Sequence, residues 1–328
     1  MKNNLLFFIL CIIIFLTFSV LLVNKSQDKK HSSNLRKVSV RLKWLDQAQF
    51  SGHYVADSMG YYKENGLDVK VNPGGPNISP IQMVVTGTDD FGITSGNQII
   101  LAREQGVPVV AIAVIFQKSP ISIVSLKDKN IESPKDLVNK RVGIVYSDDD
   151  EIIFKALLRK EELKDSNVFT EARIFDLSQL RAGKIDAEVV YENNEVYLLN
   201  KEGYSTNLIR PRDYGINFYG DTIFTTEKMI KENPELVDKF IDATIKGWDY
   251  AIKNVDYAIE QTLMKDPSLD RNHQLYFLNS SIPLIETEKI GISSGTIWNS
   301  MLQILMEQGL VKKSDSIDSI YSNIFVDK

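Results

Sequence analysis

Cysteine and histidine are scarce in this chain of 328 residues. Its one cysteine, Cys11, lies inside an apolar run near the N-terminus. The folded part therefore holds no disulfide, no cysteine zinc cluster and no cysteine nucleophile. The three histidines, His31, His53 and His273, are too widely separated to show the spacing of metal ligands. We expect no metal site in this protein.

An excess of positive charge is also missing. Lysine and arginine number 38 against 43 aspartates and glutamates, which gives a net charge of −5. No run rich in lysine and arginine falls on a strand or helix that also carries aromatic residues, so nucleic acid is not expected as a partner. The composition, 43% hydrophobic and 25% charged, is typical of a globular protein. The length allows one large or two medium α/β domains.

One long hydrophobic run stands at the N-terminus, LLFFILCIIIFLTFSVLLV at residues 5–23. It is long enough to cross a bilayer as a helix. A cleavable signal peptide has a shorter apolar region, followed by small residues at the cut. No Ala-x-Ala pattern follows here, so we predict that residues 1–24 are an uncleaved membrane anchor, with a cleaved signal as the alternative. Residues 25–37 are polar and indicate a flexible tether.

The rest of the chain alternates strands and helices. From residue 38 to 115 the order is β-α-β-α-β-α-β, which is typical of a parallel sheet with crossover helices. A second, smaller α/β unit follows, with strands predicted at 121–126, 141–146, 172–176 and 185–191. After a connection near 207–216, the pattern predicts a strand at 222–226 and helices at 234–253, 255–264, 270–279 and 295–309. We therefore predict a larger α/β lobe from 38–119 plus 218–328 and a smaller one from 120–217.

Residues 41–62 organise this pattern, because a strand ends there and a helix begins. Trp44, Gln47 and Gln49 fall at the carboxyl end of the strand, the edge at which open α/β sheets bind ligands. Tryptophan offers a flat stacking surface, and glutamine offers both a donor and an acceptor. These three residues are our first ligand-binding candidates. The alternative, that Trp44 only fills the core, remains open.

Extended segments of the sequence carry a family pattern. They are RLKWLDQAQFSGHYVADSMGYYKENGLDVKV, a Gly-Gly loop, and VVTGTDDFGITSGNQIILAREQGVPVVAIAVIFQKSP. Across roughly residues 38–262 the chain resembles the extracytoplasmic solute-binding proteins for thiamine pyrimidine precursors, whose superfamily includes aliphatic sulfonate binders. The resemblance implies a two-lobed α/β fold, the periplasmic-binding-protein (Venus flytrap) fold of type II, preceded by the transmembrane helix. It also implies capture of an aromatic, amine-bearing heterocycle on the extracytoplasmic side of the cell membrane and its transfer to an ABC permease.

The same superfamily contains hydroxymethylpyrimidine phosphate synthase, an enzyme with pyridoxal phosphate, an iron-binding cysteine motif, and a lysine and a histidine around the end of the third strand. Thr94 and Gln98 stand at the corresponding places, and neither can form a Schiff base or act as a general base at neutral pH. An acidic loop at residues 147–151 replaces the glycine-rich turn that would meet a phosphate. We therefore expect a binding protein without a cofactor, not an enzyme. The alternatives are a synthase-like enzyme of thiamine biosynthesis and a ligand-sensing subunit of a membrane signalling system.

The resemblance places further candidates on the facing edges of the two lobes. Glu195 is expected opposite Trp44 as an isolated carboxylate, which accepts hydrogen bonds from an amino group and disfavours anionic ligands. Its alternative role is an acid at a helix start, and Asp221 is either a ligand contact or a cap. His53 is expected on a helix surface, and residues 148–150 in a solvated loop. The full set of ligand-binding candidates is Trp44, Gln47, Gln49, Thr94, Tyr191, Asn194, Glu195, Tyr219 and Asp221.

Overall fold

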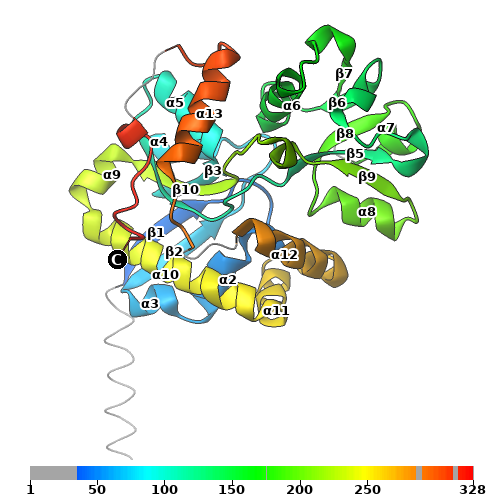
Figure 1. Cartoon of the computed structure of the whole chain (residues 1–328). Coiled ribbons are helices and arrows are strands. Elements are labelled where there is room, and N and C mark those ends of the chain that lie inside the picture. Colours follow the sequence, from blue (N-terminus) through cyan, green and yellow to red (C-terminus); the bar gives the residue numbers. More distant parts are fainter. Residues whose placement is uncertain (1–34, 175, 286–289, 313–316, 328) are drawn as a thin grey trace, which may run out of the picture.

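The computed structural model describes residues 35–174, 176–285, 290–312 and 317–327, and in them the chain folds into two lobes (Figure 1). The first lobe is built on a five-stranded sheet with the strand order β2-β1-β3-β10-β4. Its strands are β1 (Arg36–Arg41), β2 (Leu67–Asn72), β3 (Phe91–Ser95), β4 (Val109–Val114) and β10 (Asp221–Thr226). Strand β1 is parallel to β2 and β3, whereas β10 is antiparallel to β3 and β4.

The second lobe is built on another five-stranded sheet of the described residues, in the order β7-β6-β8-β5-β9. Its strands are β5 (Ile121–Leu126), β6 (Arg141–Ile144), β7 (Phe169–Ala172), β8 (Ala187–Tyr191) and β9 (Thr206–Ile209). The chain enters this sheet between β4 and β5 and returns to the first between β9 and β10. The predicted two-sheet α/β architecture is confirmed, whereas the exact residue boundaries of the lobes stay a prediction.

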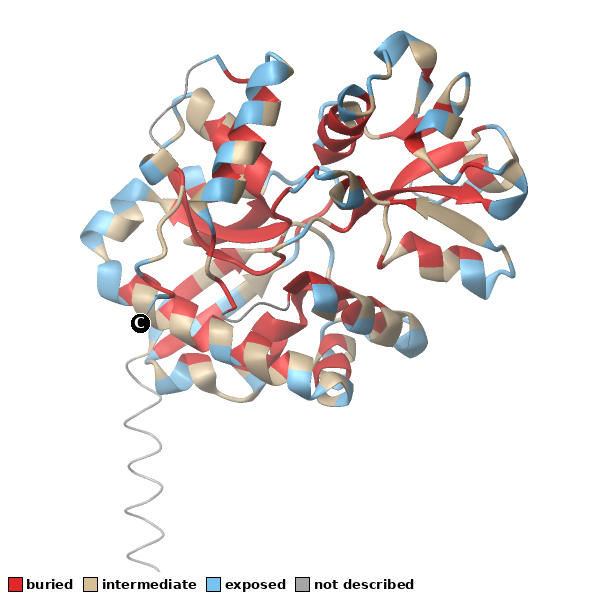
Figure 2. Ribbon diagram, in the orientation of Figure 1, coloured by how far each residue is buried: buried red, intermediate tan, exposed pale blue. Residues whose placement is uncertain are grey.

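Helices cover both sheets, so that the central strands form the buried layer of each lobe (Figure 2). Strands β4 and β5 are buried at every residue, as expected for apolar strands covered on both faces. The second lobe carries α6 (Asp149–Lys160), α7 (Ser178–Arg181) and α8 (Glu195–Lys201). The first lobe carries the 3-10 helix η1 (Ala48–Phe50), then α2 (Ser51–Ser58), α3 (Tyr61–Glu64), α4 (Pro80–Val85), α5 (Gly96–Glu104), α9 (Glu227–Glu232), α10 (Pro234–Lys253), α11 (Val255–Lys265), α12 (Arg271–Ile285) and α13 (Gly295–Glu307).

The predicted membrane anchor at residues 5–23 lies outside the described residues, as does most of the predicted tether. Across the part of the chain that the structure does describe, no helix has the combined length and apolar character that crossing a bilayer requires. The transmembrane segment therefore stays a prediction from the sequence.

Most predicted elements are present, and the differences lie mainly in the second lobe. Helix α10 spans residues 234–253 as predicted, with Pro234 in its first turn. Strand β9 falls in the segment expected to be a connection. Helix α8 begins at Glu195, which agrees with the alternative role of that residue as an acid at a helix start. Strand β7 ends at Ala172, where a strand was expected to begin. It is a mostly exposed edge strand, so it lacks the alternation of apolar residues by which strands are found.

Helices α2 and α10 pack closely because each presents a glycine at their contact. A Cβ atom on Gly247 would lie 2.2 Å from the carbonyl oxygen of Gly52, so only glycine permits this approach. The packing buries His53, whose side chain is 0% exposed. The expected surface position of His53 is therefore wrong. Burial lowers the pKa of His53 to about 3, so its imidazole is neutral at physiological pH.

Candidate functional site

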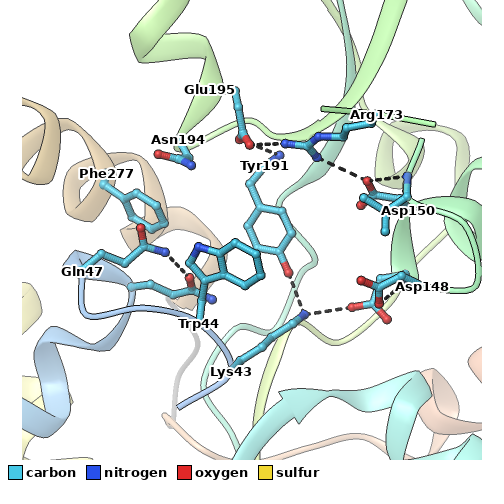
Figure 3. Close-up of a pocket in the computed structure, with 13 residues that line it drawn as sticks. Lys43, Trp44, Gln47, Asp148, Asp150, Arg173, Tyr191, Asn194, Glu195 and Phe277 are labelled. Atoms are coloured by element: carbon cyan, nitrogen blue, oxygen red, sulfur yellow. Dashed lines mark hydrogen bonds and ion pairs between the residues drawn. The ribbon is translucent and has the colours of Figure 1, made fainter. Parts of the chain in front are cut away.

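A cavity of about 160 Å³ lies between the two lobes, where the carboxyl ends of β1, β6 and β8 meet. Such strand ends are the usual ligand sites of open α/β sheets. Figure 3 shows the side chains around the cavity. Its lining consists of Lys43, Trp44, Gln47, Gln49, Val145, Asp148, Asp149, Asp150, Arg173, Tyr191, Asn194, Glu195 and Phe277.

Three aromatic side chains from different elements form the apolar part of the wall. Trp44 follows β1, Tyr191 ends β8, and Phe277 belongs to α12. Trp44 is half-buried and packs against the core of the first lobe while it lines the cavity. The two interpretations of Trp44 therefore do not exclude each other. Flat faces of this kind favour a planar, aromatic ligand.

The two glutamines form a chain of hydrogen bonds that ends at Asp221. Gln47 donates from Nε2 to Oε1 of Gln49 at 2.7 Å, and Gln49 donates from Nε2 to both carboxylate oxygens of Asp221 at 2.9 Å. Asp221 lies beneath the cavity lining and is buried, and burial raises its pKa to about 6 although Lys43 and Gln49 oppose the shift. The amide of Gln49 is thus engaged on both sides, which leaves Gln47 as the more available of the two for a ligand.

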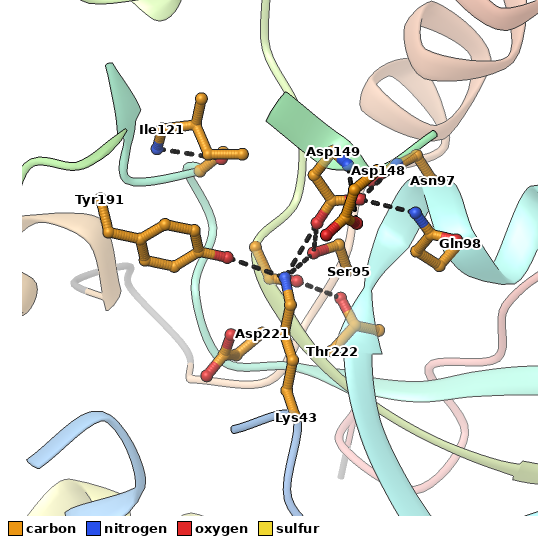
Figure 4. Close-up of polar contacts among 12 residues, drawn as sticks. Lys43, Ser95, Asn97, Gln98, Ile121, Asp148, Asp149, Tyr191, Asp221 and Thr222 are labelled. Carbon is orange, nitrogen blue, oxygen red and sulfur yellow. Dashed lines mark hydrogen bonds and ion pairs between the residues drawn. The ribbon is translucent and has the colours of Figure 1, made fainter. Parts of the chain in front are cut away.

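Lys43 reaches across the cavity from the first lobe to the second (Figure 4). Its ammonium group donates to the Ser95 hydroxyl, to Asp149 Oδ2 at 2.9 Å and to the Tyr191 hydroxyl at 2.7 Å, which uses all three of its donors. Burial alone lowers the pKa of Lys43, but Asp149, Tyr191 and Asp221 together raise it well above its usual range. Lys43 is therefore a permanent cation at physiological pH.

Arg173 is the second buried cation, and three carboxylates of the second lobe surround it. Its guanidinium contacts Glu195, lies 3.3 Å from Asp150 Oδ2 and lies 3.1 Å from Glu188 Oε1. Glu188 is 0% exposed. Burial raises the pKa of both Asp150 and Glu188 to about 7, although Arg173 opposes the shift, because one cation does not compensate three buried anions.

These raised pKa values predict that Asp150 and Glu188 stabilise the protein more at pH 5 than at pH 8. Asp150 and Glu188 bind protons more tightly in the folded protein than in the unfolded chain, where acids titrate near 4. Their contribution to the free energy of unfolding is therefore complete below about pH 4 and is lost as the pH rises through about 7, by on the order of 1 kcal/mol or more per group. Urea unfolding at a series of pH values measures the loss.

Glu188→Gln tests the origin of that pH dependence. The amide mimics the protonated acid, so the variant should lose roughly half of the decline between pH 5 and pH 8. Asp68→Asn, an exposed change on β2, is the control and should keep the wild-type profile. A Glu188→Gln profile identical to that of the wild type would mean that the buried acids of the second lobe are not the source.

The structure brings six of the nine predicted site residues to the cavity wall, namely Trp44, Gln47, Gln49, Tyr191, Asn194 and Glu195. The other three lie elsewhere. Thr94 pairs with Thr222 inside the first sheet, and Asp221 supports Gln49 from below. Tyr219 is fully buried and packs on Trp298 with ring centroids 5.2 Å apart. Ligand contact by these three stays a prediction that the cavity lining does not support.

Two expectations about charged residues require correction. Residues 148–150 do not form a solvated loop, because Asp149 and Asp150 begin α6 with buried side chains and Asp148 caps it by accepting the Asp149 N–H at 2.8 Å. Glu195 is not an isolated carboxylate, because Arg173 holds it. In the described residues, no group of three or more acidic, histidine or cysteine side chains is arranged to hold a metal ion.

Sequence reasoning missed Lys43, Arg173 and Asp149, which are half of the six charged side chains that line the cavity. A signal was present for Arg173, since Glu188 interrupts the apolar strand AEVVY and a buried acid requires a partner. For Lys43 and Asp149, neither the local pattern nor the spacing indicated an inward position.

The two lobes also touch on both sides of the cavity. On one side α8 meets α12, where the rings of Tyr197 and His273 stack with centroids 4.9 Å apart. On the other side Gln308, just after α13, donates from Nε2 to the carbonyl oxygen of Ile152 in α6 at 2.8 Å. The lobes are therefore in a closed arrangement around the cavity.

Comparison with known proteins places this site in a family. A family model described as NMT1/THI5 like matches residues 47–258. The formylaminopyrimidine-binding protein of Halalkalibacterium halodurans is 30% identical over 76% of this chain and 78% of its own. The riboflavin-binding protein RibY of Chloroflexus aurantiacus is 25% identical over 89% of this chain and 86% of its own. More distant relatives are named 4-amino-5-hydroxymethyl-2-methylpyrimidine phosphate synthase.

Solved structures support the fold. The periplasmic aliphatic sulphonate binding protein SsuA from Escherichia coli superimposes with a TM-score of 0.71 at 14% identity, over 88% of this chain and 92% of that one. This likeness confirms the predicted periplasmic-binding-protein fold. Since the family match spans more than half of the sequence, the chain belongs to the NMT1/THI5-like family.

Proposed function

We propose that this protein is the extracytoplasmic solute receptor of an ABC importer and captures a thiamine pyrimidine precursor, or a similar single-ring aromatic amine, between its lobes. In this proposal residues 5–23 anchor it to the cell membrane and the folded part lies outside the cytoplasm. The proposal draws on the family, on the periplasmic-binding-protein fold and on the aromatic cavity.

The observation that carries the choice of ligand is the size of the cavity. Its volume of about 160 Å³ is close to that of an engineered cavity of about 150 Å³ that binds benzene. One pyrimidine ring with small substituents matches this space. The three fused rings of riboflavin require the lobes to move apart, so the formylaminopyrimidine-binding relative is the better guide to the ligand than RibY.

The polar side chains at the cavity suit a ligand that donates hydrogen bonds. Glu195 accepts from Arg173 through one oxygen and from the Tyr191 backbone N–H at 3.1 Å through the other. Each carboxylate oxygen has two lone pairs, so an exocyclic amino group can add a further hydrogen bond. Asn194 and Gln47 contribute amide groups at the same wall. These amides can form hydrogen bonds with the ring nitrogens of a pyrimidine.

The same residues support binding better than synthase chemistry. Lys43 has a pKa well above its usual range, because Asp149 and its other partners outweigh burial, so its amine does not add to an aldehyde. Pyridoxal phosphate also needs a place for its phosphate, and the carboxylates of Asp148, Asp149 and Asp150 stand at the corresponding edge of the cavity. The residues present do not fit that cofactor.

Calorimetric titration of the purified full chain tests the proposal. We expect saturable binding of 4-amino-5-hydroxymethyl-2-methylpyrimidine and no measurable binding of methanesulfonate. Tight binding of riboflavin would identify a flavin carrier instead, and a protein that binds none of the three would contradict the proposal. Cross-linking of the tagged chain in its native membrane distinguishes a permease partner from a sensor kinase.

Trp44→Ala should weaken binding of the aminopyrimidine at least about tenfold, because it removes a stacking contact worth roughly 1–3 kcal/mol. Stability should fall much less, since Trp44 is only half-buried. Leu45→Ala is the matched control, because Leu45 is adjacent, 54% exposed and absent from the cavity lining. If Trp44→Ala unfolds while its folded fraction binds normally, Trp44 is a core residue without a ligand role.

A further inference from the structure

A single carboxylate of the second lobe receives hydrogen bonds from four side chains of the first lobe (Figure 4). Lys43 Nζ lies 2.9 Å from Asp149 Oδ2, and the Ser95 hydroxyl donates to the same oxygen. Asn97 Nδ2 and Gln98 Nε2 donate to Asp149 Oδ1 at 2.7 Å and 2.8 Å. The four donors come from the end of β1 and from the junction of β3 with α5.

These four donors have the composition of an anion site. One ammonium, one hydroxyl and two amides converge on two oxygen atoms, as they would on a phosphate or sulfonate group. They lie at the N-terminus of α5, where the helix dipole also favours negative charge. Asp149 is only 3% exposed, so its carboxylate fills the position.

We propose that the carboxylate of Asp149 is the permanent occupant of the anion site that these four donors form. It thereby restricts the cavity to ligands without a phosphate or sulfonate group. The inference rests on the proposed function only in treating the cavity as the ligand site. Asp149 is held at the site by the chain itself, so a dissolved anion must compete with an occupant of very high effective concentration.

The charges around the site support this role. The Lys43 ammonium and the Ser95 hydrogen bond outweigh burial and hold the pKa of Asp149 at about 2, so the occupant is an anion at every physiological pH. Asp148, which caps α6, and Asp221 also lie close enough to Lys43 to raise its pKa, as does Asp149 itself. A second anion beside these carboxylates is repelled, so displacement of Asp149 from its place is required before a phosphate can bind.

Asp149→Ala tests the proposal, with inorganic phosphate and methanesulfonate as probes. The variant keeps the four donors and removes the occupant, so we expect it to bind phosphate at least about tenfold more tightly than the wild type. Its melting temperature should also rise with added phosphate at constant ionic strength, whereas that of the wild type should not. Both readouts use the full chain without any heterocycle, so they are independent of whether an aminopyrimidine binds.

Two further variants identify the cause. Glu151→Ala removes one negative charge from the same turn of α6, but Glu151 contacts Ser147 and Lys155 and not the donors, so it should gain no phosphate binding. Adding Lys43→Gln to Asp149→Ala should abolish the binding that Asp149→Ala gained. If Glu151→Ala gains as much as Asp149→Ala, net charge alone explains the effect and the proposal is wrong.

Two experiments test the proposal even if Asp149→Ala does not fold unaided, one on refolding of that variant and one on the wild type. Refolding of that variant in phosphate but not in chloride of equal ionic strength supports the proposal. Binding of phosphate to the wild type that Lys43→Gln abolishes overturns it, because Asp149 then yields the site to a dissolved anion. Equal phosphate affinity of the wild type and Asp149→Ala overturns it as well.

Discussion

Replacing Arg173 with methionine should lower the free energy of unfolding by about 3–5 kcal/mol at neutral pH. Methionine matches the aliphatic part of the arginine side chain but has no charge, so it leaves three buried carboxylates, those of Asp150, Glu188 and Glu195, without their common cation. An uncompensated buried charge is far more costly than the loss of one contact. Equilibrium unfolding in urea at pH 7 and 8 measures the effect.

The deficit of Arg173→Met should shrink at pH 5. The pKa values of Asp150 and Glu188 are already raised to about 7 by burial, and removal of the guanidinium raises them further. At pH 5 these groups are therefore protonated and need no cation. Arg181→Met, which breaks the exposed pair with Glu202, is the control and should cost less than about 1 kcal/mol at either pH. A deficit that is independent of pH would mean that packing, and not charge, explains the loss.

The fold was more predictable than the charges at the site. Strands β4 and β5 and helix α10 follow from long apolar runs and a proline at a helix start, which are local signals. The edge strand β7 has no such signal, because it buries little. The carboxyl end of a strand is likewise a local feature, so sequence pattern alone is sufficient to place Trp44 and Gln47 at the edge where the cavity lies.

Lys43 shows why the rest of the site could not be predicted. The alternation of β1 places Lys43 on the polar face with Arg41, which predicts a solvated side chain. The strand ends at Arg41, however, so the chain turns and directs Lys43 into the cavity. Its partners Asp149 and Tyr191 are more than 100 residues away, and only the closure of the lobes brings them together.

Lys43→Met should lower the free energy of unfolding by about 3–5 kcal/mol and also separate the lobes. The change leaves the buried carboxylate of Asp149 with neutral donors only. It also removes the hydrogen bonds of Lys43 to Ser95 of the first lobe and to Tyr191 of the second. Small-angle X-ray scattering should show a larger radius of gyration for Lys43→Met than for the wild type, both without ligand.

Controls separate closure from stability. Lys253→Met breaks an exposed pair with Asp249 on α10 and should cost no more than about 0.5 kcal/mol without a change in size. Lys43→Met combined with Asp149→Asn removes both charges and should recover part of the lost stability.

Arg173 and its three carboxylate partners belong to the second lobe, so Arg173→Met should destabilise the protein without opening it. If Arg173→Met opens the lobes as far as Lys43→Met does, general loss of stability controls closure, and the bridge from Lys43 to Asp149 does not.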